Sequence, residues 1–286
     1  MGSNSNADVL SSASAAPPAL SISDKEEINI LVTGFGQFSS FSVNPSYLIA
    51  RSLPTTIYPS LQSPSCPRIT LHVHPDPVRV SYRAIRTLIP ELLSPSKTPV
   101  INFATAVTPD SSNDAIYSEE DDGVIGPYDA VLHIGMANGH NYYACEAQAH
   151  RDGYEIKDVD GETMQKDTFW KSRGAPPILK SAFQVDGDVW RRWKRDAPDL
   201  DLRPSFDPGH YCCDFIYYTS LYELWRTNRE RRVIFLHVPG ATSHASIERG
   251  TRAAVGLIRA MVETWESEAE KEKKKKENEE AGEEVK

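Results

Sequence analysis

Residues 28 to 53 read INILVTGFGQFSSFSVNPSYLIARSL, and this stretch decides the fold class. A short apolar run over residues 28–32 ends at Gly34, as a buried parallel strand does where it meets a loop. A helix is expected to begin at Pro45, because proline's missing N–H costs nothing at the first helical position. The stretch therefore predicts a strand, a loop rich in glycine, serine and phenylalanine, and a helix.

The same alternation continues along the chain. Further strands are predicted over residues 68–75, 98–107, 128–137, 140–150 and 231–240, and further helices over residues 78–93, 189–196, 212–225 and 246–265. Short apolar strands that alternate with helices predict a three-layer α/β/α fold with a mostly parallel, twisted central sheet. In such sheets ligands bind at the carboxyl ends of the strands.

The domain limits follow from local composition. Residues 1–26 consist mostly of Ser, Ala, Pro and Asn, which predicts a disordered N-terminal arm. Residues 27–266 are expected to form a single α/β domain with an acidic insertion near 107–127 and a second insertion near 160–204. Residues 267–286 are a charged C-terminal tail without an apolar stripe, which predicts a solvated or frayed segment.

Composition excludes several classes of protein. The chain has 286 residues, a formal charge of −9 and a pI near 5.4, so a broad nucleic-acid surface is not expected. No run approaches the roughly 18 apolar residues of a membrane span, and the first residues lack the pattern of a secretory signal. The four cysteines form no CxxC pair or disulfide framework. We expect a cytoplasmic protein with free thiols and no cofactor; whether it forms homo-oligomers is left open.

A candidate nucleophile lies in the segment DPGHYCCDFIYY, residues 207–218. The turn at its start is followed by apolar residues with helical spacing, which places Cys212 and Cys213 in the first turn of a helix. Unpaired backbone N–H groups and the helix dipole favour thiolate over thiol there, and a thiolate attacks carbonyl carbons. The alternative is that these cysteines only pack in the core.

A thiol hydrolase also needs a base and a group that orients the base. His237 ends the apolar strand IFLHVP, where its side chain can reach the rim of the sheet. Glu146 lies in YYACEAQAH, a segment with no other ionised side chain, where a carboxylate needs a partner. The alternatives are that His237 is a satisfied core histidine and that Glu146 pairs with Arg151.

Four ordered motifs resemble one family. ILVTGFGQFSSFSVNPSYLIARSL, VLHIGMANGHNYYACEAQAHRDGY, DPGHYCCDFIYY and FLHVP together resemble the pyroglutamyl peptidase I (pyrrolidone-carboxylate peptidase) family of cytosolic cysteine peptidases. The resemblance implies Cys213 as nucleophile, His237 as base and Glu146 as its partner, with Cys212 as a packing thiol. It also implies an exopeptidase that removes N-terminal pyroglutamate from peptides through a thioester.

The resemblance maps the substrate pocket onto Phe35 and Phe38, with Asn44 as a nearby structural or hydrogen-bonding residue. Met136 occupies a position where many bacterial members have a glutamine near the lactam. Two aromatic faces suit a flat, neutral lactam ring, whereas a charged ammonium group would lose its hydration there.

Some residues depart from the family pattern, and other functions remain open. Asp214 stands where the family has Asn; its charge would disfavour the thiolate, unless it is solvated at the helix start. One alternative is a catalytically impaired relative that binds modified peptide N-termini or acts as a scaffold. A glutamine amidotransferase would want glycines flanking its cysteine, which Cys213 lacks. His72 and His74 lack a clear third ligand for zinc, so no metal is expected.

Overall fold

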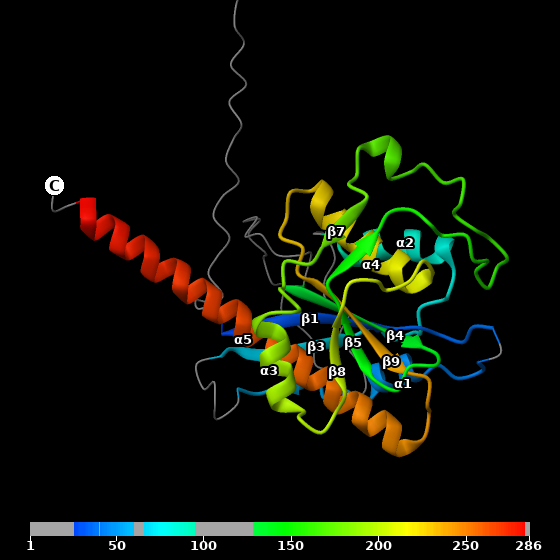
Figure 1. Cartoon of the computed structure of the whole chain (residues 1–286), viewed down its shortest axis with the longest axis horizontal. Coiled ribbons are helices and arrows are strands. Elements are labelled where there is room, and N and C mark those ends of the chain that lie inside the picture. The colour runs from blue at the N-terminus through cyan, green and yellow to red at the C-terminus, as the bar shows by residue number, and fades with distance from the viewer. Residues whose placement is uncertain (1–25, 40, 60–65, 95–127, 284–286) are drawn as a thin grey trace, which may run out of the picture.

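The computed structural model describes residues 26–39, 41–59, 66–94 and 128–283, which are coloured in Figure 1. The predicted N-terminal arm before residue 26, the strand over 98–107 and the insertion over 107–127 lie outside these residues. The other predicted strands and helices can be compared with the structure directly.

The centre of the fold is a seven-stranded sheet with the order β2-β3-β1-β4-β9-β5-β8. Strands β3, β1, β4 and β9 are parallel neighbours, whereas β5 runs antiparallel to β9 and β2 antiparallel to β3. The strands are β1 (Glu27–Gly34), β2 (Thr56–Ile57), β3 (Arg68–Val73), β4 (Ala130–Ala137), β5 (Tyr143–Glu146), β8 (Leu202–Ser205) and β9 (Val233–Pro239). The predicted α/β class with a mostly parallel sheet is confirmed.

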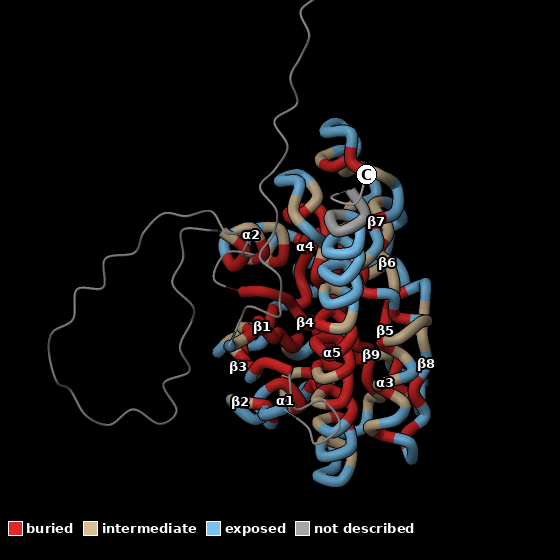
Figure 2. Tube along the Cα trace, turned by 90° about the vertical axis from the view of Figure 1, so that its left-hand side faces the viewer, coloured by how far each residue is buried: buried red, intermediate tan, exposed pale blue. Residues whose placement is uncertain are grey.

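Helices cover both faces of this sheet, which gives the three layers expected from the sequence (Figures 1 and 2). On one face the core includes residues of α1 (Pro45–Arg51), α3 (Asp188–Asp196) and α5 (His244–Glu283). On the other face α2 (Tyr82–Leu92) and α4 (Cys212–Arg226) pack on the sheet. The strands between them are almost wholly buried, as their continuous apolar runs indicate.

The segment predicted as one extended strand over 140–150 is two strands in different sheets. After β5 the chain leaves the central sheet, and β6 (Gln148–His150) pairs with β7 (Ile178–Lys180) beside α4. A short 3-10 helix, η2 (Lys171–Arg173), lies between β6 and β7 in the chain. Within the predicted insertion near 160–204, β8 forms an edge strand of the central sheet and α3 packs on α5.

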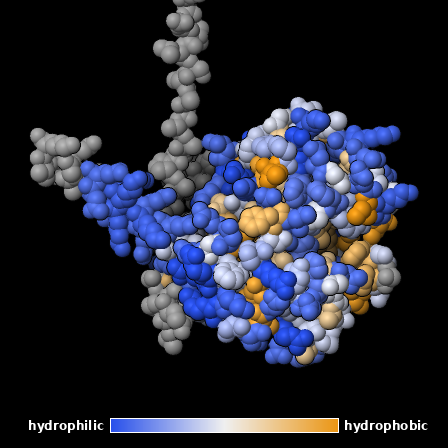
Figure 3. Space-filling model, in the orientation of Figure 1, coloured by the Kyte–Doolittle hydropathy of each residue, from blue (hydrophilic) through white to orange (hydrophobic). Residues whose placement is uncertain are grey.

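The last helix is longer than the sequence pattern indicated. Its apolar stripe ends near Trp265, but α5 continues to Glu283 as a single 40-residue helix. Beyond the body of the protein it projects as an exposed, uniformly hydrophilic segment (Figures 1 and 3). Lysine and glutamate are good helix formers, and pairs such as Lys275–Glu279 (3.8 Å) add i,i+4 attraction. The tail is thus solvated, as expected, but helical.

No helix among the described residues combines the length and apolar character that crossing a bilayer requires.

The loop after β1 is held by close contacts with the start of α1. A Cβ at Gly34 would lie 2.6 Å from the Cα of Tyr47 and 2.7 Å from the carbonyl oxygen of Ser46, so only glycine permits this approach. The Asn44 side chain accepts a hydrogen bond from the Ser46 N–H (3.1 Å) and donates one to the Gly36 carbonyl (2.9 Å). Asn44 therefore both caps α1 and fixes the loop that follows β1.

We expect Gly34→Ala to destabilise the protein by about 1–3 kcal/mol, because the new methyl group meets backbone atoms that cannot rotate away. Gly36→Ala is the matched control, since its Cβ would meet nothing nearer than a side-chain atom of Pro77 at 3.4 Å. Urea unfolding of both variants measures the difference. Equal free energies of unfolding for the two variants would contradict this account of the contact.

Candidate active site

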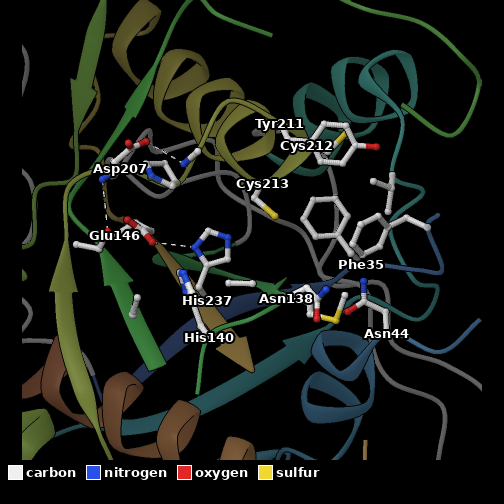
Figure 4. A pocket seen from close by; sticks show the side chains of 18 of the residues that line it. Phe35, Asn44, Asn138, His140, Glu146, Asp207, Tyr211, Cys212, Cys213 and His237 are labelled. Atoms are coloured by element: carbon white, nitrogen blue, oxygen red, sulfur yellow. Dashed lines mark hydrogen bonds and ion pairs between the residues drawn. The ribbon is translucent and has the colours of Figure 1, made fainter. Parts of the chain in front are cut away.

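A cavity of about 550 Å³ opens at the carboxyl ends of β1, β4 and β9, where the fold predicts a ligand site. Its walls come from the loop after β1, the ends of β4 and β5, and the loop that precedes α4. All seven predicted site residues line it: Phe35, Phe38, Asn44, Met136, Glu146, Cys213 and His237. Figure 4 labels Phe35, Asn44, Glu146, Cys213 and His237 among them. Segments far apart in the sequence therefore meet in one place.

The register of β5 against β9 brings His237 and Glu146 together. Ala144 pairs with His237 and Glu146 pairs with Phe235, so His237 and Glu146 are diagonal neighbours on the same face of the sheet. Their side chains join through His237 Nδ1 and Glu146 Oε1 at 2.8 Å. Both residues are buried, with 7% and 1% of their surface exposed. With Nδ1 engaged by the carboxylate, Nε2 is the ring nitrogen left for another partner.

Cys213 lies on the other side of the imidazole, in the first turn of α4 (Figure 4). Gly135 of β4 is the register partner of His237, and a Cβ at Gly135 would come within 2.9 Å of the Cys213 sulfur. The absence of a side chain at Gly135 therefore leaves room for the sulfur above the sheet. Cys213 is half-buried, whereas Cys212 is fully buried among apolar side chains.

The surroundings of His237 favour its charged form. Burial alone would lower its pKa, but hydrogen bonds and charge interactions with Cys213 and Glu146 outweigh burial and raise the pKa to about 10. His133 on neighbouring β4 provides the contrast. Its two ring nitrogens meet the hydroxyls of Thr33 (2.7 Å) and Ser220 (2.8 Å), and burial lowers its pKa to about 3. His133 is thus the satisfied core histidine, and His237 is the one with ionisable partners.

The alternative partner for Glu146 is not used. Arg151 binds Asp152 (2.8 Å) and the carbonyl of Ala175 (2.7 Å) instead. The second carboxylate oxygen of Glu146 is buried and has no hydrogen-bond partner among the described residues. The Glu146 carboxylate is therefore directed at His237 alone.

Aromatic side chains form one wall of the cavity. Phe35 is buried in the core, while Phe38 packs against Phe41 and Tyr211 with ring centroids 5.4 and 6.4 Å away. Tyr211, directly before the two cysteines, is a lining residue that the sequence reasoning missed. Its only sequence signal was an aromatic residue two positions before the candidate nucleophile Cys213.

Two of the predicted pocket residues have limited freedom to bind a ligand. The Asn44 side chain is committed to α1 and to Gly36, so it supports the aromatic loop. Met136 lies one residue after Gly135 and so points to the opposite face of β4, yet its side chain reaches the rim of the cavity.

Asp214 is buried, so of the two alternatives left open by the sequence, a solvated residue at the helix start is wrong. Its carboxylate accepts the backbone N–H of His150 (2.9 Å) and meets His150 Nδ1 at 3.1 Å. Burial raises the pKa of Asp214 to about 6, and the hydrogen bonds with His150 offset only part of that effect. The hydrogen bond with Asp214 in turn raises the pKa of His150.

The side chains of His72 and His74, which the sequence analysis considered as zinc ligands, bind different partners. His72 Nε2 pairs with the side chain of Asn29 at 2.7 Å, and His74 Nδ1 pairs with the carbonyl of Asp76 at 2.7 Å. His72 thus makes a polar contact with the neighbouring strand β1, and His74 lies just after the end of β3.

No protein-family model matches the chain. Human Pyroglutamyl-peptidase 1 is 25% identical over 237 residues, which cover 83% of this chain and 91% of the human protein. The mouse Pyroglutamyl-peptidase 1 is 25% identical over 233 residues, or 82% of this chain and 89% of that protein. These alignments extend over nearly the whole of both relatives.

Solved structures of pyrrolidone carboxyl peptidases have a fold similar to that of this chain. The pyrrolidone carboxyl peptidase of Pyrococcus furiosus matches with a TM-score of 0.56 and 18% identity, over 85% of this chain and 100% of that one. The enzyme of Thermus thermophilus matches with a TM-score of 0.53 and 23% identity, over 80% and 98%. The resemblance inferred from the four motifs is confirmed: the chain is similar in sequence to Pyroglutamyl-peptidase 1 of human and mouse, and its fold is similar to that of the pyrrolidone carboxyl peptidases.

Proposed function

We propose that this chain is a cysteine peptidase that removes pyroglutamate from the N-terminus of peptides. The observation that carries the proposal is the placement of the His237 imidazole between the Cys213 sulfur and the Glu146 carboxylate, beside an aromatic cavity (Figure 4). The arrangement has the three parts of a thiol hydrolase, namely a nucleophile, a base and a group that orients the base. The sequence relatives are named for the same activity.

In the proposed reaction Cys213 attacks the carbonyl carbon of the pyroglutamyl residue. His237 first pairs with the thiolate as an imidazolium and then donates its proton to the departing peptide amine. The acyl group stays on the sulfur as a thioester. Water, deprotonated by His237, then attacks the thioester, releases pyroglutamate and restores the thiolate–imidazolium pair. Glu146 holds the ring and stabilises its positive charge throughout.

The cavity wall suits the proposed substrate. A pyroglutamyl residue carries no ammonium group, because its amine is closed into a neutral γ-lactam. Phe38 and Tyr211 offer apolar faces to such a ring, and an uncyclised N-terminus would leave its charge without water against the same wall. Specificity for the lactam thus follows from desolvation.

We expect purified wild-type protein to release a fluorescent amine from a pyroglutamyl amide under reducing conditions. Cys213→Ala should lower kcat by about three orders of magnitude or more, because it removes the nucleophile. Cys212→Ala is the matched control and should retain activity, since that thiol is buried. If wild type binds the amide without cleaving it, the chain is a non-catalytic binder of modified N-termini; equal loss in both variants would contradict the assignment of Cys213.

Phe38→Ala should raise KM for the pyroglutamyl amide by about tenfold with a smaller effect on kcat, because an aromatic face worth roughly 1–1.5 kcal/mol is lost away from the reacting bond. Phe206→Ala removes an exposed phenylalanine that does not line the cavity, and serves as the control. Steady-state kinetics of the two variants test the aromatic wall. Unchanged KM in Phe38→Ala would mean that the lactam binds elsewhere.

The proposed ion pair also predicts how His237 titrates. Its pKa of about 10 exceeds the ordinary 6.5, so the charged ring stabilises the folded state fully below about pH 6.5, and this contribution is lost as the pH rises through about 10. Glu146→Gln should lower the pKa of His237 by about 1 unit or more, because a neighbouring negative charge is removed.

An NMR titration of the His237 ring measures this shift directly. Asp207→Asn is the control, because it makes the same carboxylate-to-amide change elsewhere in the cavity wall. Asp207 accepts the Gly209 N–H at 3.0 Å, and its replacement should leave the pKa of His237 unchanged. A His237 ring that is neutral at pH 7 in the wild type would argue against the ion pair.

A further inference from the structure

A second cluster of ionisable side chains lies beside the active site but outside the cavity lining. It consists of His150 at the end of β6, His210 in the loop before α4, and Asp214 in the first turn of α4. Asp214 Oδ2 is 3.1 Å from His150 Nδ1 and 3.6 Å from His210 Nδ1. Within the described part of the chain, this is the one group of three or more such residues whose donor atoms all lie within 4.8 Å of one another.

The surrounding structure holds these three side chains in place. Asp214 has no exposed surface, and the backbone N–H of His150 fixes its other carboxylate oxygen at 2.9 Å. The His210 ring lies against Gly153, where a Cβ would come within 2.8 Å of His210 Nδ1. The Tyr154 ring meets His210 edge-on at 6.4 Å. The hydrogen bond from the His150 N–H to Asp214 is of the kind that orients ligands in known metal sites.

The donor set has a clear chemical preference. Two imidazole nitrogens and one carboxylate oxygen suit Zn²⁺ and neighbouring transition-metal ions, whereas Mg²⁺ and Ca²⁺ prefer oxygen ligands alone. Tetrahedral bonds of about 2.0–2.1 Å place neighbouring ligand atoms roughly 3.3–3.5 Å apart. The distances of 3.1 and 3.6 Å from Asp214 Oδ2 bracket that spacing, and the ligand atoms of His150 and His210 lie within 4.8 Å of each other.

We propose that His150, His210 and Asp214 form a binding site for a divalent transition-metal ion such as Zn²⁺. The half-exposed His210 side chain gives the ion access from solvent, and a water molecule is expected to supply the fourth ligand. Sequence reasoning missed this site, because its ligands come from three separate places, namely β6, a loop and α4.

A bound ion would connect the site to the cavity wall. It would tie His210, and with it the loop of Asp207, Pro208 and Gly209 that lines the cavity, to β6 and to α4. Asp214 also follows Cys213 directly in the chain. Metal binding at this cluster is independent of the proposed peptidase activity, so each can fail without the other.

The test is metal binding to Cys213→Ala protein, freed of metal by a chelator. This background is needed because Cys213 and His237 are themselves potential zinc ligands. Calorimetric titration with Zn²⁺ should show one ion bound per chain, and Zn²⁺ should raise the melting temperature. Mg²⁺ at the same concentration should leave it unchanged. Co²⁺ should give the visible absorption of a tetrahedral site.

Ligand variants in the same background locate the ion. His210→Gln alters a half-exposed side chain and should fold normally, while weakening Zn²⁺ binding by about tenfold or more. Asp214→Asn should weaken it at least as much. His244→Gln changes an exposed histidine at the start of α5 and should bind Zn²⁺ as the parent does. Absence of stoichiometric binding, or binding by His210→Gln equal to that of His244→Gln, would overturn the proposal.

Discussion

The hydrogen bond between His237 and Glu146 depends on a single feature of the sheet, the antiparallel register of β5 against β9. A shift of one residue would turn Glu146 to the opposite face and separate the two side chains. Burying two charged groups is costly even when they pair, so stability alone does not explain the contact. It is well explained by the need to hold an imidazole in one orientation and one tautomer.

Every other part of the site is arranged around that imidazole. Gly135 on the neighbouring strand leaves the space that the Cys213 sulfur occupies, and α4 begins where its first turn can place the sulfur there. The same helix start is where backbone N–H groups are available to a negative charge. The aromatic loop after β1 is held by the close approach of Gly34 to the start of α1 and by the hydrogen bond from Asn44 to Gly36. The central sheet thus sets the positions, and the loops at its carboxyl edge provide the binding wall.

Sequence reasoning predicted the elements that depend on local pattern. The apolar runs of β1, β4 and β9 and the helix start at Pro45 are local signals, and the structure has the corresponding elements. The break between β5 and β6 was missed, because the alternation of residues 143–149 continues across it while the pairing partner changes. The length of α5 was underestimated, because the apolar stripe ends before the helix does.

In the candidate site, too, residues with a local sequence pattern were predicted, and contacts between distant segments were missed. Cys213, His237 and Glu146 were found from motif order, and all three line one cavity. The burial of Asp214 was not predicted, because its partner His150 comes from a strand pair that no local pattern indicates. Tyr211 was missed for a related reason, since its contact with Phe38 joins two loops far apart in the chain. Contacts between distant segments are visible only once the sheet order is known.

If Cys213 carries the acyl group, acid quenching during turnover of an activated pyroglutamyl ester should trap that group on its sulfur. Mass spectrometry of the intact protein should show one added pyroglutamyl group, and digestion should place it on the peptide that contains Cys213. The group should persist in Cys212→Ala and be absent in Cys213→Ala. An acyl group that remains in Cys213→Ala, or rapid ester hydrolysis by the wild type with Cys213 never acylated, would contradict the account.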